Sequence, residues 1–137
     1  RRKKDESSMK AKKRRPSPKV SRVDVELYGF SVLVVIHPDL KEFNRWMRKN
    51  VDESYYPEDA DGSRPLGRCC SRGGSSVIWL PSIPTTPDQL GTLAHEISHA
   101  VFNAFELIGI ESGYRNDEPF CYALKYIMAE SLKKLRK

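Results

Sequence analysis

Residues 86–107, TPDQLGTLAHEISHAVFNAFEL, form the longest stretch of the chain with one consistent pattern. Thr86 followed by Pro87 is a strong start signal, because threonine caps free backbone N–H groups and proline already has a helical φ. The apolar residues then recur every three or four positions, as on the buried side of a helix; they are Leu90, Leu93, Ala94, Ile97, Val101, Ala104 and Phe105. The stretch therefore predicts a long amphipathic helix, which glycines at 109 and 113 bring to an end.

Upstream of this helix, four short segments have the composition of strands. Residues 23–27 alternate apolar and polar side chains, and residues 30–36 are rich in β-branched residues. Together they predict a hairpin, or one long strand bent at Gly29. Residues 66–71 and 76–80 flank a pair of glycines, which predicts a second hairpin.

Two further helices are predicted. Asp39 stands where a helix N-cap would, and apolar residues at helical spacing carry the pattern to about Asn50. A last helix begins near residues 116–117 and runs toward Leu132. Residues 51–66, which contain prolines and a glycine, are expected to be a loop. Strands and helices in this order predict an α+β domain with a small twisted sheet.

The chain has 137 residues, 39% of them hydrophobic and 31% charged, which is ordinary for one globular domain. The longest mostly apolar run, residues 30–36, is far shorter than the about 20 residues that a membrane-spanning helix needs. No apolar segment follows the charged N-terminus closely enough to act as a secretory signal. We therefore expect no membrane association and no secretion by a signal peptide.

The net charge of +6 is unevenly distributed. Residues 1–22 carry eleven Lys or Arg and two acids, and residues 133–137 carry +4, which leaves −7 for residues 23–132. Because residues 1–22 also have almost no apolar side chains, we expect a flexible basic arm, a folded domain at 23–132 and a basic end at 133–137. A block of like charge is typical of contacts to nucleic acid or another acidic partner, and equally of a solvated tail.

The cysteines do not form a disulfide framework. Their number is odd and two of them are adjacent: Cys69, Cys70 and Cys121. The chain has no C-x2-C pair, so a cysteine-based zinc site is not indicated. Reduced thiols in an intracellular compartment are expected.

The long helix contains the sequence His95-Glu96-Ile-Ser-His99. Residues four apart lie about 40° from each other on a helix, so both imidazoles can hold one Zn²⁺ at the ~2.0–2.1 Å that nitrogen ligands need. Glu96 lies about 100° from His95, which directs it toward water on the metal rather than toward the metal. A carboxylate there can take the proton of the attacking water and deliver it to the leaving amine. The alternative is a helix with two packed or exposed histidines and a solvated glutamate.

A catalytic zinc needs a third protein ligand and an open fourth position. His37 is the one remaining histidine, and its place at the end of a strand favours a capping or packing role. Glu118, at the start of the last helix, is favoured because a reversal at the two glycines would return it to the histidine pair. Asp117 and Glu111 are the alternatives.

The helix motif followed by NDEPFCY at residues 116–122 resembles the zincin superfamily of metallopeptidases, in the branch whose third ligand is a glutamate. The similarity covers residues 75–132 and is greatest to small metallopeptidases encoded by bacteriophages. The ImmA/IrrE-type peptidases have a related layout. The resemblance implies a minimal zincin-like domain, in which a small sheet packs on the active-site helix and a C-terminal helix carries a ligand.

The resemblance also implies the role of each site residue. Glu96 would be the general base and acid, and one Zn²⁺ per chain would be held by His95, His99 and Glu118. An extended protein or peptide substrate would pair with an edge strand, formed by Ser76, Val77, Ile78 and Trp79. Pro119 departs from the family, where small residues are common, but proline is tolerated in a first helical turn.

Three side chains have two interpretations each. Tyr114 and Tyr122 can donate to the oxyanion that forms during peptide hydrolysis, or be core or rim aromatics. Cys70 can reach the zinc as a blocking thiolate, favoured by the neighbouring arginines, or be an idle thiol.

The predicted function is zinc-dependent hydrolysis of peptide bonds, in a bacterial host cytoplasm or in association with a virion. One alternative is a catalytically inactive zinc-binding accessory or virion-associated module. Another is a peptidase that the basic arm directs to DNA-associated proteins. The sequence indicates neither the protein substrate nor the oligomeric state.

Overall fold

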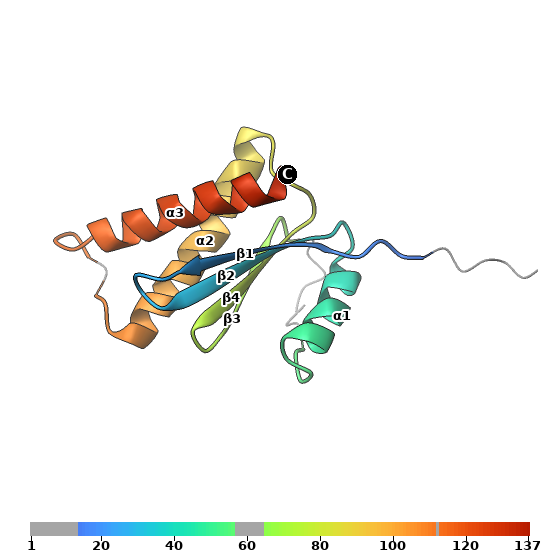
Figure 1. Ribbon diagram of the computed structural model, residues 1–137, viewed down its shortest axis with the longest axis horizontal. Helices are drawn as coiled ribbons and strands as arrows, with labels where there is room; N and C mark the ends of the chain where they lie inside the picture. The colour runs from blue at the N-terminus through green and yellow to red at the C-terminus, as the bar shows by residue number, and fades with distance from the viewer. Residues whose placement is uncertain (1–13, 57–64, 112) are drawn as a thin grey trace, which may run out of the picture.

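The computed structural model describes residues 14–56, 65–111 and 113–137 (Figure 1). Its four-stranded sheet has the order β1-β2-β4-β3. The strands are β1 Lys19–Val25, β2 Phe30–Ile36, β3 Arg68–Arg72 and β4 Ser75–Leu80. β1–β2 and β3–β4 are antiparallel hairpins, and a parallel pair, β2–β4, joins them. Both predicted hairpins are confirmed, and the first segment is a hairpin rather than one bent strand.

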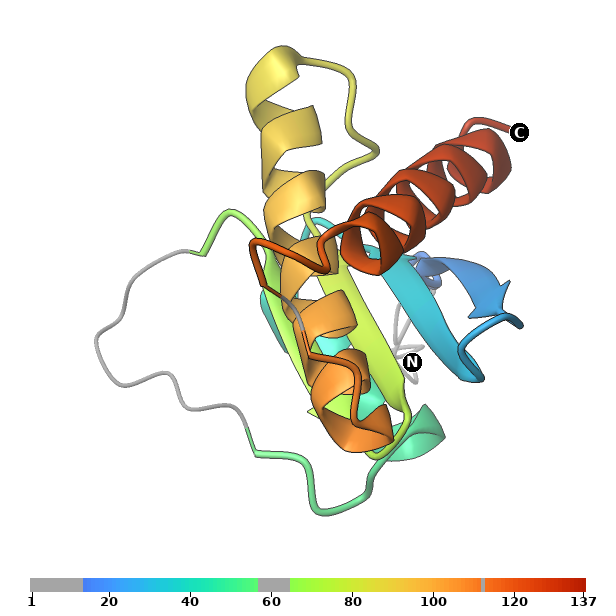
Figure 2. The same cartoon turned by 90° about the vertical axis from the view of Figure 1, so that its left-hand side faces the viewer.

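Three helices cover the sheet: α1 Leu40–Asn50, α2 Pro87–Ile108 and α3 Glu118–Leu135. α1 lies on one face, and α2 and α3 lie on the other (Figure 1, Figure 2). The chain is therefore an α+β domain with a mixed sheet, which confirms the predicted class. Among the described residues, no helix is long and apolar enough to cross a lipid bilayer.

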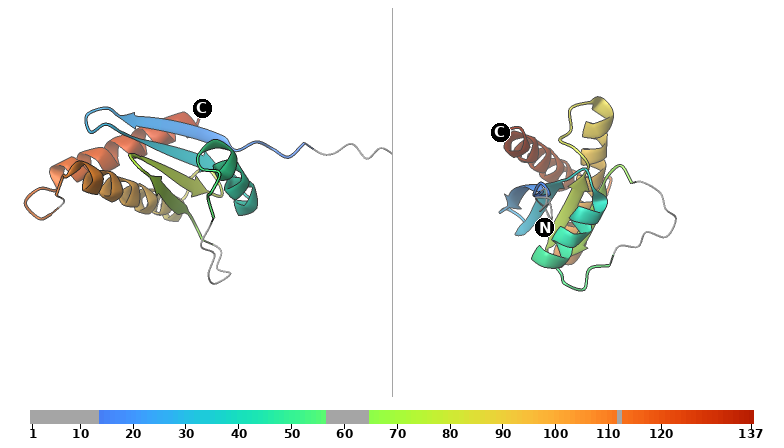
Figure 3. Two further views of the ribbon diagram at one scale, coloured as in Figure 1. Left: turned by 90° about the horizontal axis from the view of Figure 1, so that it is seen from below. Right: turned by 90° about the vertical axis from the view of Figure 1, so that its right-hand side faces the viewer.

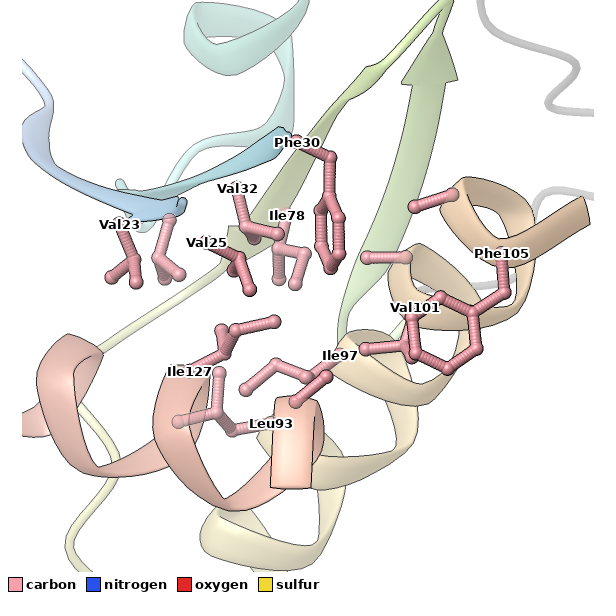
Figure 4. Close-up of a cluster of buried hydrophobic side chains, with 14 of the residues drawn as sticks. Val23, Val25, Phe30, Val32, Ile78, Leu93, Ile97, Val101, Phe105 and Ile127 are labelled. Carbon is pink, nitrogen blue, oxygen red and sulfur yellow. The ribbon is translucent and has the colours of Figure 1, made fainter. Parts of the chain in front are cut away.

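Each face of the sheet has its own hydrophobic core. In the larger one, Ile78 of β4 packs among side chains of α2 and α3 that include Ile97 and Ile127 (Figure 4). In the smaller one, Phe43 of α1 lies against Trp79 of β4, with ring centroids 6.2 Å apart. Burial of each such side chain contributes about 1.5–3 kcal/mol. The larger core fixes the inner side of α2 and so determines which of its residues face outward.

The N-terminal end of the chain enters the fold earlier than its composition indicates. β1 begins at Lys19, so residues 19–22, which the sequence assigns to the arm, belong to the sheet. Each of the seven residues of β2 has a partner in β1, from Lys19 opposite Ile36 to Val25 opposite Phe30. Because all seven residues of β2 pair with β1, β1 begins before its own alternating apolar residues, which start at Val23. Residues 1–13 of the predicted arm, like residues 57–64 of the predicted loop, lie outside the described residues.

The C-terminal boundary also differs from the prediction. α3 continues to Leu135, so residues 133–135 belong to the helix rather than to a separate basic end. The physical reason is Leu135 itself, which is fully buried in the larger core. One apolar side chain among four basic ones is enough to add a helical turn to the domain.

Candidate functional site

α2 carries the whole motif and is fixed at both ends by its own residues. At its start, the Thr86 hydroxyl accepts a hydrogen bond from the Gln89 N–H at 3.2 Å, and the Gln89 side chain accepts one from the Thr86 N–H at 3.3 Å. This reciprocal arrangement is a capping box. At its end, Gly109 has a φ of 74°, the left-handed conformation that closes many helices. Both features confirm the helix predicted from the sequence.

The two histidines lie next to each other on the outer side of α2. Their Nε2 atoms are 3.1 Å apart, and the rings are nearly perpendicular, at 82° with centroids 4.7 Å apart. Two nitrogen ligands of a tetrahedral zinc are about 3.3 Å apart. Both rings are exposed. The pair therefore fits two adjacent positions around one metal ion, and the same distance also allows one ring to donate a hydrogen bond to the other.

Glu96 differs from the histidines in being buried, with 8% of its surface exposed. Burial raises the pKa of its carboxyl group, and His95 and His99 act in the opposite direction. A carboxyl group held beside a histidine pair can accept a proton and return it. The environment of Glu96 thus agrees with the role that the motif predicts.

Gly67, just before β3, is a site residue that the sequence did not reveal. A Cβ atom added at Gly67 would lie 3.0 Å from Thr92 Cγ2 and 3.1 Å from Glu96 Cγ. The strand therefore approaches α2 closely enough that only glycine fits without adjustment. This approach covers Glu96 from one side and explains its burial. No local pattern signals this contact, because Gly67 and Glu96 are brought together only by the fold.

The cysteine near the site is Cys69, not Cys70. Adjacent strand residues point to opposite faces of a sheet, and Cys70 faces α1, where its Sγ lies 3.5 Å from the Tyr55 hydroxyl. Of the two interpretations of Cys70, this position fits the idle thiol and not a blocking thiolate on the metal. Cys69 packs on the α2 side, and burial, with a smaller contribution from Glu96, raises the pKa of its thiol to about 12. Cys69 is thus a protonated thiol beside the catalytic candidate.

A groove runs beside the motif, between α2 and the chain entering β3. Its volume is about 580 Å³, and it contains His95 and Glu96 at one end. The other lining residues come from the N-terminal half of α2 and the β3 approach: Leu66, Gly67, Asp88, Gly91 and Thr92. We call this the α2–β3 groove. It has room for a few side chains of an extended chain that passes the histidines.

The acidic candidates for a third ligand are not gathered around the histidines. Within the described ranges, no three His, Cys, Asp or Glu side chains form a group that could hold a metal ion. Glu118 is exposed at the first position of α3. Asp117 lines a hollow with Phe102 and Phe120, and Glu111 lines another at the end of α2. The structure therefore brings together His95, His99 and Glu96, but not Glu118, Asp117 or Glu111.

The strand predicted to be an edge is internal. β4 pairs with β2 on one side and β3 on the other, so Ser76, Val77, Ile78 and Trp79 have no open edge. All four are buried, because helices cover both faces. Such a continuous apolar run is typical of a central strand. In the described part of the chain the outer strand on the α2 side is β3, which pairs only with β4.

The two tyrosines contact other aromatic side chains rather than the histidines. Tyr122 contacts Tyr28 at the β1–β2 turn and stacks on Tyr126, with ring centroids 6.4 and 6.1 Å apart. Tyr114 is 99% exposed and lines the hollow formed by Phe102 and Phe120. Neither position supports an oxyanion donor in this conformation, and both agree with the rim-aromatic alternative.

His37 has the packing role that its position indicates. Its ring is buried at the end of β2, and Nδ1 accepts a hydrogen bond from the Asp39 N–H at 3.0 Å. Nε2 lies 3.2 Å from the Pro16 carbonyl oxygen, to which it can donate. Both ring nitrogens are thus engaged in holding the chain around the start of α1.

No family model, curated protein or solved structure matches this chain. The functional conclusion therefore rests on the geometry of α2 and its neighbours.

Proposed function

We propose that this chain is a minimal zincin-like peptidase that uses one zinc ion to hydrolyse peptide bonds. The observation that carries the proposal is the 3.1 Å separation of the His95 and His99 Nε2 atoms, with the buried Glu96 next to them. A pair of exposed imidazoles alone would fit many metal sites. A pair combined with a buried carboxyl group of raised pKa supplies two of the three protein ligands and the base of a hydrolytic zinc site.

In this proposal the third zinc ligand comes from the beginning of α3. Phe120 stacks on Phe102 with ring centroids 4.5 Å apart, and Phe102 follows His99 by three residues, or about 4.5 Å along the helix axis. This contact supports a third ligand from the start of α3, because it links that end of the helix to the part of α2 that follows His99. Glu118 is the first candidate, and Asp117 and Glu111 remain the alternatives.

A bound zinc would supply a Lewis acid that lowers the pKa of a coordinated water to about 7. Glu96 would take a proton from the attacking water and return it to the amine of the departing peptide. Its burial under Gly67 supports this role in two ways. It keeps the carboxyl group in place, and it raises the pKa of that group, which favours the protonated form that donates to the departing amine.

The substrate would be an extended peptide that adds to the sheet at β3. This strand has its outer edge next to α2, and peptides bind such edges through backbone hydrogen bonds. The α2–β3 groove would then receive side chains on one side of the scissile bond. β3 thus takes the role that was predicted for residues 76–79.

The test compares Glu96→Gln with the matched change Glu106→Gln. Glu106 is an exposed glutamate on the same helix, and its substitution removes the same charge. Zinc content is measured by elemental analysis, and hydrolysis is measured on a mixture of quenched fluorescent peptides. We expect Glu96→Gln to retain zinc and to lose cleavage by at least about 100-fold, as for other general acid–base residues. Glu106→Gln should keep both.

Two outcomes would contradict the proposal. Undiminished cleavage in Glu96→Gln would show that this carboxyl group does not transfer the proton. Stoichiometric zinc with no cleavage of any peptide in the wild-type protein would instead favour the catalytically inactive zinc-binding module.

A further inference from the structure

The fold brings residues 19–22 of the basic N-terminal segment next to the basic end of α3. The Lys19 ammonium group donates a hydrogen bond to the carbonyl oxygen of Leu135, and that of Lys134 donates to the carbonyl oxygen of Arg22. β1 packs along α3 over this region (Figure 3). Segments more than a hundred residues apart therefore share one surface, a relationship that the sequence does not show.

This surface, which we call the terminal basic surface, contains five exposed basic side chains among the described residues: Lys19, Lys133, Lys134, Arg136 and Lys137. Arg15 and Arg22 lie outside it, because Arg15 pairs with Glu42 of α1, and Arg22 points to the opposite face of β1 from Lys19 and pairs with Asp24. The five make no ion pair with the described residues. Hydrogen bonds to carbonyl oxygens, such as those of Lys19 and Lys134, orient an ammonium group but leave its charge uncompensated.

The rest of the domain has a net charge of the opposite sign. Residues 23–132 carry a net −7, whereas residues 19–22 contain two basic residues and residues 133–137 carry +4. A concentrated patch of one sign on a body of opposite sign directs the binding of an oppositely charged partner. The partner of the terminal basic surface is therefore expected to be a polyanion.

The composition of the surface favours one kind of polyanion. Residues 14–22 and 129–137, from which these charges come, contain no aromatic side chain, so the charges are not interleaved with the stacking groups that bind single-stranded nucleic acid. Its charges project from a strand and from a helix end that are bonded to each other, which fixes their relative positions. Fixed charges suit the regular phosphates of a rigid duplex.

We infer that the terminal basic surface binds the phosphate backbone of double-stranded DNA without reading its sequence. This binding is separate from the proposed peptidase site. It uses side chains of β1 and of the end of α3, whereas the motif lies on α2 and next to β3.

The test measures the affinity of the full chain for a short DNA duplex by fluorescence anisotropy, over a range of salt concentrations. The double variant Lys133→Gln/Lys137→Gln removes two charges from the surface and avoids Lys134 and Arg136, which bond backbone carbonyls. We expect the slope of log K against log salt to fall by about 0.9 for each phosphate that is no longer neutralised, and affinity at low salt to drop about tenfold or more. Lys133→Arg/Lys137→Arg should retain binding.

The matched control is Arg48→Gln/Lys49→Gln, which removes two exposed charges from the last turn of α1, on the other face of the sheet. It should bind DNA almost as the wild-type protein does. The inference is overturned if both glutamine variants lose affinity equally, because net charge alone would then explain binding. It is also overturned if Lys133→Gln/Lys137→Gln binds like the wild type, or if vesicles containing phosphatidylserine bind more tightly than the duplex.

Discussion

α2 and α3 are the two helices that the proposed site requires, and they are held in place in different ways. α2 has a complete capping box at its start and a left-handed glycine at its end. α3 begins after Asp117, whose side chain makes no capping hydrogen bond. α2 is thus defined by its own residues, whereas the start of α3 is positioned by its contact with α2 through Phe120.

This difference explains which part of the site is assembled in the structure. The histidine pair needs only a regular helix, because both ligands lie on it one turn apart. A ligand from α3 needs the correct distance and rotation between two helices, and the segment joining them is short and contains two glycines. The histidine half of the proposed metal site is therefore determined by α2 alone. The half from α3 depends on how the two helices pack against each other.

The largest expected effect tests the α3 half directly. Glu118→Gln should lower zinc affinity by about 100-fold or more, because even the outer partners of metal ligands are worth 10–100-fold. Asp117→Asn and Glu111→Gln should change it less than about threefold. Competition with a chromophoric chelator measures all three, with His95→Ala as the reference for the loss of one ligand. If Asp117→Asn or Glu111→Gln has the large effect instead, that residue is the ligand; if none has, α3 supplies no ligand.

A second prediction concerns the contact that covers Glu96 on α2. Gly67→Ala should destabilise the protein by about 1–3 kcal/mol, the usual cost of overpacking, because its Cβ would meet Thr92, Glu96 and Leu80 at 3.0–3.2 Å. Urea unfolding measures this, and peptide cleavage should fall with it. Gly74→Ala is the control, since an added Cβ there has no atom within 4 Å. Equal stability of the two variants would show that the chain just before β3 does not pack tightly against α2.

The smallest expected effects are the losses of stability on substitution of the N-cap residues of α2 and α3. Thr86→Ala should cost about 1 kcal/mol, the typical value for an N-cap that loses its hydrogen bond. Asp117→Ala should cost only about 0.3–1 kcal/mol from its charge at the helix start, because it makes no capping bond. Thermal unfolding of the metal-free protein separates the two. A larger loss for Asp117→Ala would mean that α3 is also defined by its own cap.

The sequence predicted what neighbouring residues determine. Thr86 and Pro87 marked the start of α2, Asp39 marked that of α1, and both glycine turns defined hairpins. The histidine pair followed from helical geometry alone. In each case the interacting groups lie within a few positions of each other in the sequence, so the local sequence pattern is enough to predict the structure.

The errors share the opposite property. Lys19 joins the sheet because β2 supplies a distant partner, and Leu135 extends α3 because it reaches the core. β4 is central because β3 folds back outside it, which also places Cys69 rather than Cys70 beside Glu96. Gly67 gave no signal at all. These features depend on contacts between segments that are far apart in the sequence. Such contacts produce no periodic pattern of residues from which they could be predicted.

The parallel pairing of β2 with β4 also has a consequence for how the chain folds. Each hairpin can form early, since its strands are neighbours in sequence. Ser31 and Ser75, whose hydroxyl groups lie 3.0 Å apart, are separated by 44 positions, and the two halves of the sheet meet only when that long loop closes. Loop closure of this kind costs entropy before its contacts form and slows folding. The groove beside Glu96 lies between α2 and the chain entering β3, which are close in the sequence. It can therefore form with the second hairpin and α2, before the two halves of the sheet associate.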